Sequence, residues 1–118
     1  MANKIEKIEM MNHKGEWVEE EFELKPYGTP WQYERDVNDA RVKTSGGFEG
    51  DLYLCEKYLP YVVGKERFAL PGQETNLKFK EILEEFFIND PTAMQELSQR
   101  MGFFLSPALK IRYEKRMQ

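Results

Sequence analysis

The stretch that decides the fold is residues 76–105, NLKFKEILEEFFINDPTAMQELSQRMGFFL, because it carries the strongest helical pattern in the chain. Between residues 76 and 88, apolar side chains recur at the spacing that places them on one helix face: Phe79, Ile82, Leu83, Phe86 and Phe87. This spacing predicts an amphipathic helix over residues 76–88. Asp90 and Pro91 then predict the N-cap and first position of a second helix. Its apolar residues are Met94, Leu97 and Met101, and Gly102 is expected to end it.

The same combination of a capping residue and a proline recurs twice elsewhere. Ser106-Pro107 predicts the start of a last helix, and Thr29-Pro30 predicts the start of a helix that runs to about Val42. Residues 51–59, DLYLCEKYL, predict a short helix that Pro60 ends. Residues 61–63 are then expected to be extended, and residues 68–72 to form a turn-rich connection.

Residues 43–50 contain the only dense group of glycines in the chain, at positions 46, 47 and 50. No Gly-Lys-Ser/Thr sequence follows them, so a phosphate-binding loop is not indicated. Glycine has high backbone entropy. Residues 44–50 are therefore predicted to be the most mobile internal segment.

Upstream of these helices, residues 4–24 predict a β-hairpin. Asn12 to Gly15 is the expected turn, because glycine adopts positive φ without a steric cost. In the second strand Val18, Phe22 and Leu24 alternate with outward-facing residues, which are Trp17, Glu19, Glu21 and Glu23. An acidic outer face discourages strand-to-strand aggregation.

The predicted fold class is therefore α+β, with an N-terminal β-hairpin or small antiparallel sheet packed on four to five α-helices. Residues 1–118 are expected to form a single domain. Its parts are a hairpin region (1–28), a middle region of helices, glycine loop and extended link (29–72), and the C-terminal helices (73–118).

The composition argues against most kinds of catalytic site. The chain has one histidine, His13, and one cysteine, Cys55, among 118 residues. Histidine is the usual general base near neutral pH and the commonest metal ligand. We therefore expect no catalytic residues, no cofactor-binding residues, no metal site and no disulfide within the chain, and we expect Cys55 to be buried and inert.

The charge distribution bears on the kind of partner. The net charge is −4, with −5 in residues 1–59 and +1 in residues 60–118. Phosphate binding relies on clustered lysine and arginine, so nucleic acid is not the expected partner. No apolar run reaches the roughly 20 residues of a membrane span, and no secretory signal is recognisable. We expect a cytoplasmic protein that does not bind membranes.

Two groups of aromatic residues are candidates for binding a protein partner, since tryptophan and tyrosine dominate interface hot spots. The first belongs to the C-terminal helices, whose apolar area exceeds what a thin domain covers easily: Phe79, Phe86, Phe87, Phe103 and Phe104. The second comprises Trp17 and Trp31 in the acidic half.

The glutamates of the second strand are the main candidates for a different chemistry. Glu19, Glu20, Glu21 and Glu23 could serve in acid–base catalysis or metal binding, which needs a cleft and perturbed pKa values. We expect instead that these glutamates form a solvent-exposed face of the strand.

The order of elements, together with two short segments, resembles a known family. The segments are Leu59-Pro60-Tyr61-Val62-Val63 and Phe86-Phe87-Ile88-Asn89-Asp90-Pro91. Over about residues 16–105 the chain is similar to the small tail assembly chaperones encoded by long-tailed phages and prophages of Gram-positive bacteria. The resemblance implies a non-enzymatic protein that self-associates, coats the tape-measure protein and recruits tail-tube subunits in the host cytoplasm. It also implies absence from the mature virion and a longer frameshifted product.

Two other classes of function stay open at this point. One is a small phage-encoded acidic inhibitor or regulator that binds a host protein, in the extreme as a mimic of nucleic acid. The other is a small enzyme that uses the glutamates. A chaperone needs an exposed apolar face for helices, whereas a nucleic-acid mimic needs a continuous acidic face with few apolar residues.

Overall fold

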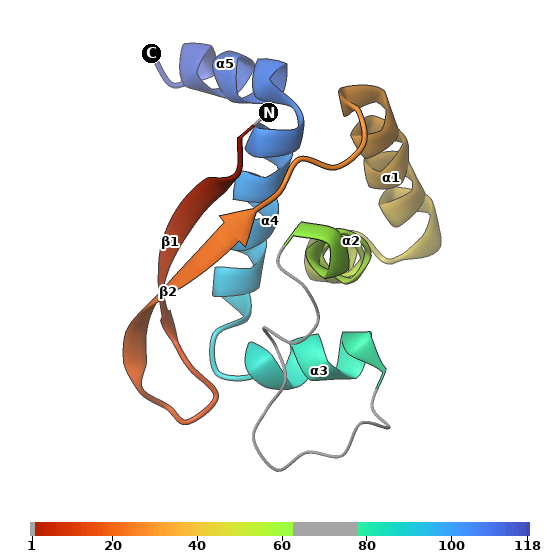
Figure 1. Ribbon diagram of the computed structural model, residues 1–118. Helices are drawn as coiled ribbons and strands as arrows, with labels where there is room; N and C mark the ends of the chain where they lie inside the picture. The colour runs from red at the N-terminus through yellow and green to blue at the C-terminus, as the bar shows by residue number, and fades with distance from the viewer. Residues whose placement is uncertain (1, 63–77) are drawn as a thin grey trace.

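The computed structural model describes residues 2–62 and 78–118 and shows an α+β architecture (Figure 1). A two-stranded antiparallel sheet is followed by five helices. The fold class predicted from the sequence is confirmed. In chain order the elements are β1 (Lys4–Met11), β2 (Trp17–Leu24), α1 (Pro30–Lys43), α2 (Gly47–Val62), α3 (Phe79–Phe86), α4 (Pro91–Leu105) and α5 (Pro107–Arg116).

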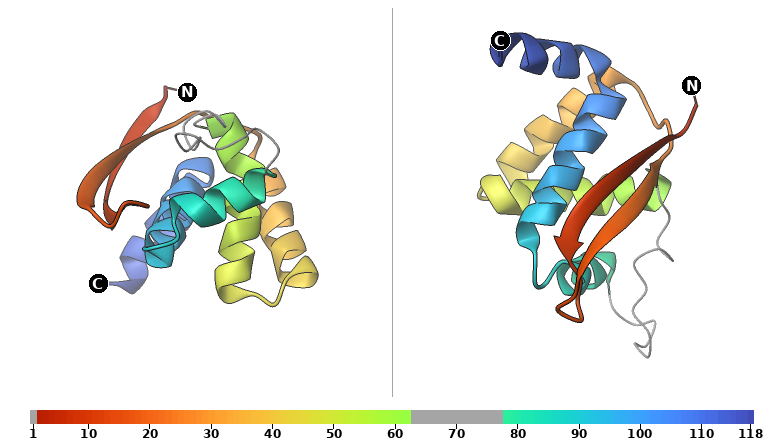
Figure 2. Two further views of the ribbon diagram at one scale, coloured as in Figure 1. Left: turned by 90° about the horizontal axis from the view of Figure 1, so that it is seen from below. Right: turned by 90° about the vertical axis from the view of Figure 1, so that its left-hand side faces the viewer.

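Helix α4 is the element around which the others are arranged. Its residues Met94, Leu97 and Met101 are fully buried, as the apolar spacing predicts. The hairpin runs along one side of α4, α1 and α2 lie on another side, and α5 crosses its end (Figures 1 and 2). The buried apolar residues of the hairpin and of α1 to α4 form one continuous core.

The hairpin has the alternation that the sequence predicts. Met11 pairs with Trp17 beside the turn, and Lys4 pairs with Leu24 at the open end. The inner face is buried, and its apolar members are Ile8, Met10, Phe22 and Leu24. Gly15 in the turn has a φ of 82°, and the Asn12 side-chain oxygen accepts hydrogen bonds from the Lys14 and Glu16 amides. The turn prediction is confirmed.

The helix starts largely follow the predicted caps. The Thr29 hydroxyl accepts a hydrogen bond from the Gln32 amide at 3.2 Å. Asp90 accepts one from the Ala93 amide at 3.3 Å. Ser106 stands at the N-cap position of α5, but its side chain makes no capping hydrogen bond.

The glycine-rich segment is not a loop throughout. Helix α2 begins at Gly47, so Phe48 and Gly50 are helical and residues 44–46 alone connect α1 to α2. Gly46 and Gly47 have φ angles of 84° and 51°. The Thr44 hydroxyl donates to the Ala40 carbonyl at 2.6 Å and accepts from the Gly46 amide at 3.1 Å. The predicted loop over 44–50 is therefore wrong from Gly47 onward, because these glycines supply the backbone of a tight helix-to-helix turn.

Two further helix boundaries differ from the prediction. Helix α2 passes through Pro60 and ends at Val62, so residues 61–62 are helical rather than extended. Pro60 has no backbone N–H to donate, so the last turn of α2 lacks the hydrogen bond that another residue would make there. Gly102 lies inside α4, which continues to Leu105. Val63, residues 68–72 and residues 76–77 of the predicted helix lie outside the described residues; α3 is described from Phe79 to Phe86.

Gly102 has a packing role that explains its place inside a helix. It is buried, and a Cβ atom added there would lie 2.5 Å from the hydroxyl oxygen of Tyr33 on α1. Tyr33 is itself buried, so its ring has little freedom to move away. The absence of a side chain at Gly102 therefore sets how closely α1 approaches α4.

We expect Gly102→Ala to destabilise the protein by about 1–3 kcal/mol, because interiors tolerate overpacking poorly. Gly50→Ala is the matched control. Gly50 lies in α2, and a Cβ atom added there would meet nothing closer than the Thr44 hydroxyl oxygen, at 3.7 Å. This substitution should stabilise the protein by about 0.5–1 kcal/mol through helix propensity. Urea unfolding measures both. Equal effects of the two substitutions would show that the Tyr33 contact is not tight.

Candidate protein-binding surface

A buried carboxylate, that of Asp36, is hydrogen-bonded to two side chains of the neighbouring helix. Asp36 on α1 is buried and accepts hydrogen bonds from the Lys57 ammonium at 2.6 Å and from the Tyr58 hydroxyl, both on α2. Burial and the bond to Asp36 raise the pKa of Tyr58. The bond to Asp36 also raises the pKa of Lys57. This cluster joins α1 to α2 and has no base left over for catalysis.

A polar groove of about 530 Å³ lies among α1, α2 and α4. Asp51 and Ser98 line it and are hydrogen-bonded, and burial raises the pKa of Asp51 despite that bond. Burial also raises the pKa of Tyr33, another lining residue, to about 12. The described residues that line the groove include no histidine or cysteine. Serine is a weak nucleophile unless an adjacent base activates it, and Asp51 is the carboxylate beside Ser98.

Cys55 is fully buried, and burial raises the pKa of its thiol, as expected for an inert cysteine. Within residues 2–62 and 78–118, no group of three histidine, cysteine, aspartate or glutamate side chains is placed to hold a metal ion. Among the same residues, no helix is long and apolar enough to cross a membrane.

The predicted partner-binding residues divide into three groups by exposure. Phe79, Phe86 and Phe87 are buried in the core, so their rings are not offered at the surface. Phe103 and Phe104 are half-buried near the end of α4. The two tryptophans are exposed: 65% of Trp17 on β2 and 76% of Trp31 on α1. The large apolar face of residues 79–87 is thus largely used within the fold.

The structure does not bring the two tryptophans together. Trp17 is the first residue of β2, beside the hairpin turn, whereas Trp31 lies in the first turn of α1, beyond the far end of β2 (Figure 1). Trp17 pairs across the hairpin with Met11, which is also exposed. Trp17 therefore belongs to an apolar pair on a sheet, while Trp31 stands on a separate helix.

The outer face of the hairpin combines apolar ends with an acidic middle. Its exposed apolar residues are Ile5, Met11 and Trp17. Its charged residues are Lys7, Glu9, Glu19, Glu21 and Glu23. Glu9 pairs directly with Glu19, which destabilises a hairpin by like-charge repulsion. Lys7 and Glu21 form a cross-strand ion pair on this face, at 3.7 Å.

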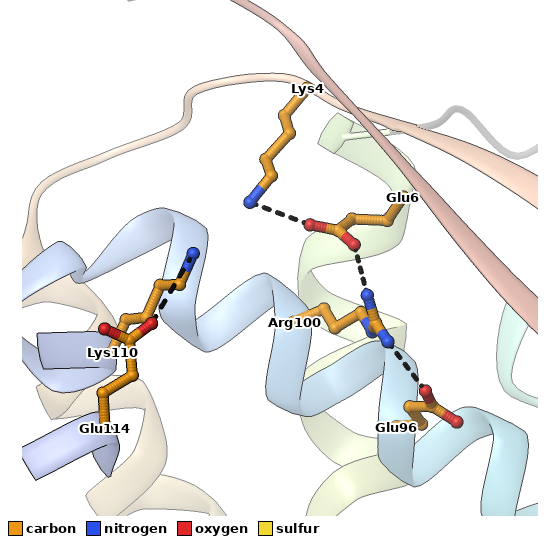
Figure 3. A network of polar contacts seen from close by, with 6 residues as sticks. All are labelled: Lys4, Glu6, Glu96, Arg100, Lys110 and Glu114. Carbon is orange, nitrogen blue, oxygen red and sulfur yellow. Dashed lines mark hydrogen bonds and ion pairs between the residues drawn. The ribbon is translucent and has the colours of Figure 1, made fainter.

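One end of the hairpin is held to α4 by a partly buried ion pair (Figure 3). Glu6 lies on the inner face of β1, where it accepts a hydrogen bond from Arg100 Nη1 at 2.6 Å and pairs with Lys4 Nζ at 2.9 Å. The other guanidinium nitrogen of Arg100 bonds to Glu96 at 3.0 Å. Burial alone would raise the pKa of Glu6, but the hydrogen bonds and charges of Lys4 and Arg100 outweigh it and lower the pKa.

The turn end of the hairpin is held to the start of α4. The Met11 amide donates a hydrogen bond to Asp90 Oδ2 at 3.0 Å, while Asp90 Oδ1 caps the helix. The side-chain amide of Asn89 donates to the Asn12 carbonyl at 3.0 Å. Asp90 thus fixes both the first turn of α4 and the position of β1.

Beside this attachment lies a shallow groove of about 400 Å³. Met11 and Trp17 form its apolar wall, and Glu9, Asp90 and Glu96 contribute carboxylates. We call Met11, Trp17 and this groove the tip surface. It combines an exposed tryptophan, a flexible methionine and negative charge on an element anchored at both ends.

Sequence reasoning missed the anchors and found only part of the surface. Glu6 lies two residues before Ile8 and four before Met10, so period-two alternation places it on the buried face. The alternation of β1 therefore predicts that Glu6 is buried. It does not predict that Glu6 pairs with Arg100, which is 94 residues away in the sequence. Asp90 was recognised as a cap, and its bond to Met11 depends on the tertiary fold.

Comparisons with protein-family models, curated proteins and solved structures found no match to this chain.

We expect Glu6→Gln to lower stability by about 1–3 kcal/mol at pH 7, because hydrogen bonds to charged groups contribute that much. The folded pKa of Glu6 is below its ordinary value of 4.5, so the stabilisation is present above pH 4.5 and is lost as pH falls through the folded pKa. The difference between wild type and variant should therefore shrink on acidification.

Urea unfolding between pH 7 and pH 3 measures this difference. Glu96→Gln is the control, because Glu96 binds the same guanidinium but is exposed and should contribute under about 1 kcal/mol. A Glu6→Gln effect that stays constant over this pH range would contradict the assignment.

Proposed function

We propose that this protein is a non-enzymatic protein-binding module that uses the tip surface. The single observation that carries the proposal is the exposed pair of Trp17 and Met11 on a hairpin anchored to α4 at both ends. A large aromatic side chain held on a rigid element loses little conformational entropy when it binds. Tryptophan is also among the residues most enriched in interface hot spots.

The charges around the tip surface indicate the chemistry of the partner. Glu9 and Glu96 line the groove, and Glu19 lies two residues from Trp17 on the same face. Such a surface suits a segment that presents an apolar side chain next to lysine or arginine. A cation can also stack on the indole ring. An amphipathic helix with a basic edge meets these requirements.

The tail assembly chaperone is the specific form of this proposal. It rests on the sequence resemblance, which supplies the tape-measure and tail-tube proteins as partners and the host cytoplasm as the location. A chaperone needs exposed apolar area for helices, whereas a nucleic-acid mimic needs a continuous acidic face, and the outer hairpin face supports the chaperone. Ile5, Met11 and Trp17 flank the acidic residues with exposed apolar area, which a helix-binding chaperone requires.

The acidic inhibitor is a second candidate, favoured by one observation. Glu9, Glu19, Glu21 and Glu23 share the outer face with a single lysine, Lys7. A host protein with a basic surface could bind there. In that case the carboxylates, rather than Trp17, would supply most of the binding energy.

We expect Trp17→Ala to weaken binding to a tape-measure protein, the partner that the proposal assigns, by at least about tenfold, the loss typical of a hot-spot tryptophan. Trp31→Ala is the matched control, an equally exposed tryptophan on another element, and should change affinity by less than about threefold. Calorimetric titration with the purified tape-measure protein gives both values.

Both variants should keep the wild-type melting temperature, since neither side chain is buried. Absence of binding by the wild-type protein would remove the chaperone proposal. Binding that survives Trp17→Ala but is lost on Glu19→Lys would favour the inhibitor.

A further inference from the structure

Helix α5 is the one helix of the described chain without a buried residue. It crosses the end of α4, its main neighbour, and one of its contacts there is the Tyr113 ring, 5.2 Å from that of Phe103 (Figure 1). Ile111 and Met117 remain largely exposed. A helix of ten residues is marginally stable in water unless packing supports it. Helix α4 supplies that packing through Leu109 and Tyr113, and Ile111 and Met117 remain available to a further surface.

The charge of α5 indicates what that surface is. Residues 107–118 contain four cations and one carboxylate, namely Lys110, Arg112, Lys115, Arg116 and Glu114. Lys110 pairs with Glu114 at 4.0 Å, whereas Arg112, Lys115 and Arg116 make no ion pair within the described residues. The complement must therefore be acidic and must also offer some apolar area.

The outer face of the hairpin has these properties. Glu9 and Glu19 are exposed there and make no ion pair within the described residues, and Ile5 and Met11 add apolar area. Within one chain only the margins of the two surfaces meet, at a groove of about 350 Å³ that Ile5 and Lys110 both line. The rest of the outer face points away, because the hairpin turns its inner face toward α4 (Figure 2). Residues 2–62 and 78–118 of the same chain therefore offer α5 no such face, and a second molecule can supply it.

We propose that α5 of one copy docks on the outer hairpin face of a second copy. The contact joins two different surfaces, so each copy can bind one neighbour through α5 and another through its hairpin. Made with two different neighbours, such contacts build rings or open chains; made reciprocally between the same two copies, they close a two-fold dimer. The inference goes beyond the proposed function because it requires no foreign partner, although its hairpin surface shares Glu9 and Met11 with the tip surface.

The contact should respond strongly to salt. Its charges are exposed, and exposed charges are screened beyond about 8–10 Å at physiological ionic strength. We expect sedimentation velocity at 50 mM salt to show species in steps of the 14.0 kDa protomer mass. These species should shift toward monomer at 500 mM salt.

Charge reversal identifies the two surfaces. Arg112→Glu with Arg116→Glu alters α5, and Glu9→Lys with Glu19→Lys alters the hairpin while keeping a like-charged cross-strand pair. Each double variant alone should associate at least about tenfold more weakly than wild type, because like charges then meet. An equimolar mixture should recover association, since each variant then offers a surface opposite in charge to its neighbour's. Arg35→Glu with Arg41→Glu, exposed on α1, is the control and should associate like wild type.

Three results would contradict the proposed contact between α5 and the hairpin. A wild-type protein that stays monomeric at millimolar concentration and 50 mM salt would overturn the inference. So would association that both double variants retain, or a mixture that fails to recover it. Melting curves establish that each variant is folded. Partner binding lost on Trp17→Ala is a separate result and would stand under any of these outcomes.

Discussion

The packing of the hairpin's inner face on α4 is the interaction on which the rest of the structure depends. A two-stranded hairpin is marginally stable in water by itself. Here its inner face is buried through Ile8, Met10, Phe22 and Leu24. Without that burial, the acidic outer face would oppose pairing, because Glu9 lies directly opposite Glu19. The helices thus provide the stability that the strands lack.

Two polar attachments make this packing specific. Hydrophobic burial has no directional preference, so apolar contacts alone leave the hairpin free to slide along α4. The Glu6–Arg100 bond fixes one position along the strand, and the Met11–Asp90 bond fixes another near the turn. Because the inner face and backbone are held in this way, the outer face is free to carry exposed residues that folding does not require.

Local chemistry explains which parts of the fold the sequence predicted. The caps at Thr29 and Asp90, the turn at Gly15 and the alternation of β2 each depend on a few neighbouring residues, and each is confirmed. The glycine segment was misread because glycine permits both mobile loops and tight turns, and the packing of α1 on α2 selects the turn.

The candidate surface was harder to predict, because it depends on packing between distant parts of the chain and not on neighbouring residues. An apolar helix face does not reveal whether its partner belongs to the same chain, and Phe79, Phe86 and Phe87 are buried within it. Trp17 was correctly placed on the outer face by strand alternation. Its anchored setting depends on Arg100 and Asp90, which lie far along the chain from the hairpin, so sequence periodicity could not supply it.

Hydrogen–deuterium exchange of the native protein tests the central claim most directly, namely that the hairpin and α4 form one cooperative unit. The cross-strand amides of residues 4–11 and 17–24 should exchange in the same slow class as the amides inside α4, through global unfolding. Exchange of the hairpin amides orders of magnitude sooner, while α4 remains protected, would show that the hairpin opens independently and would contradict the account.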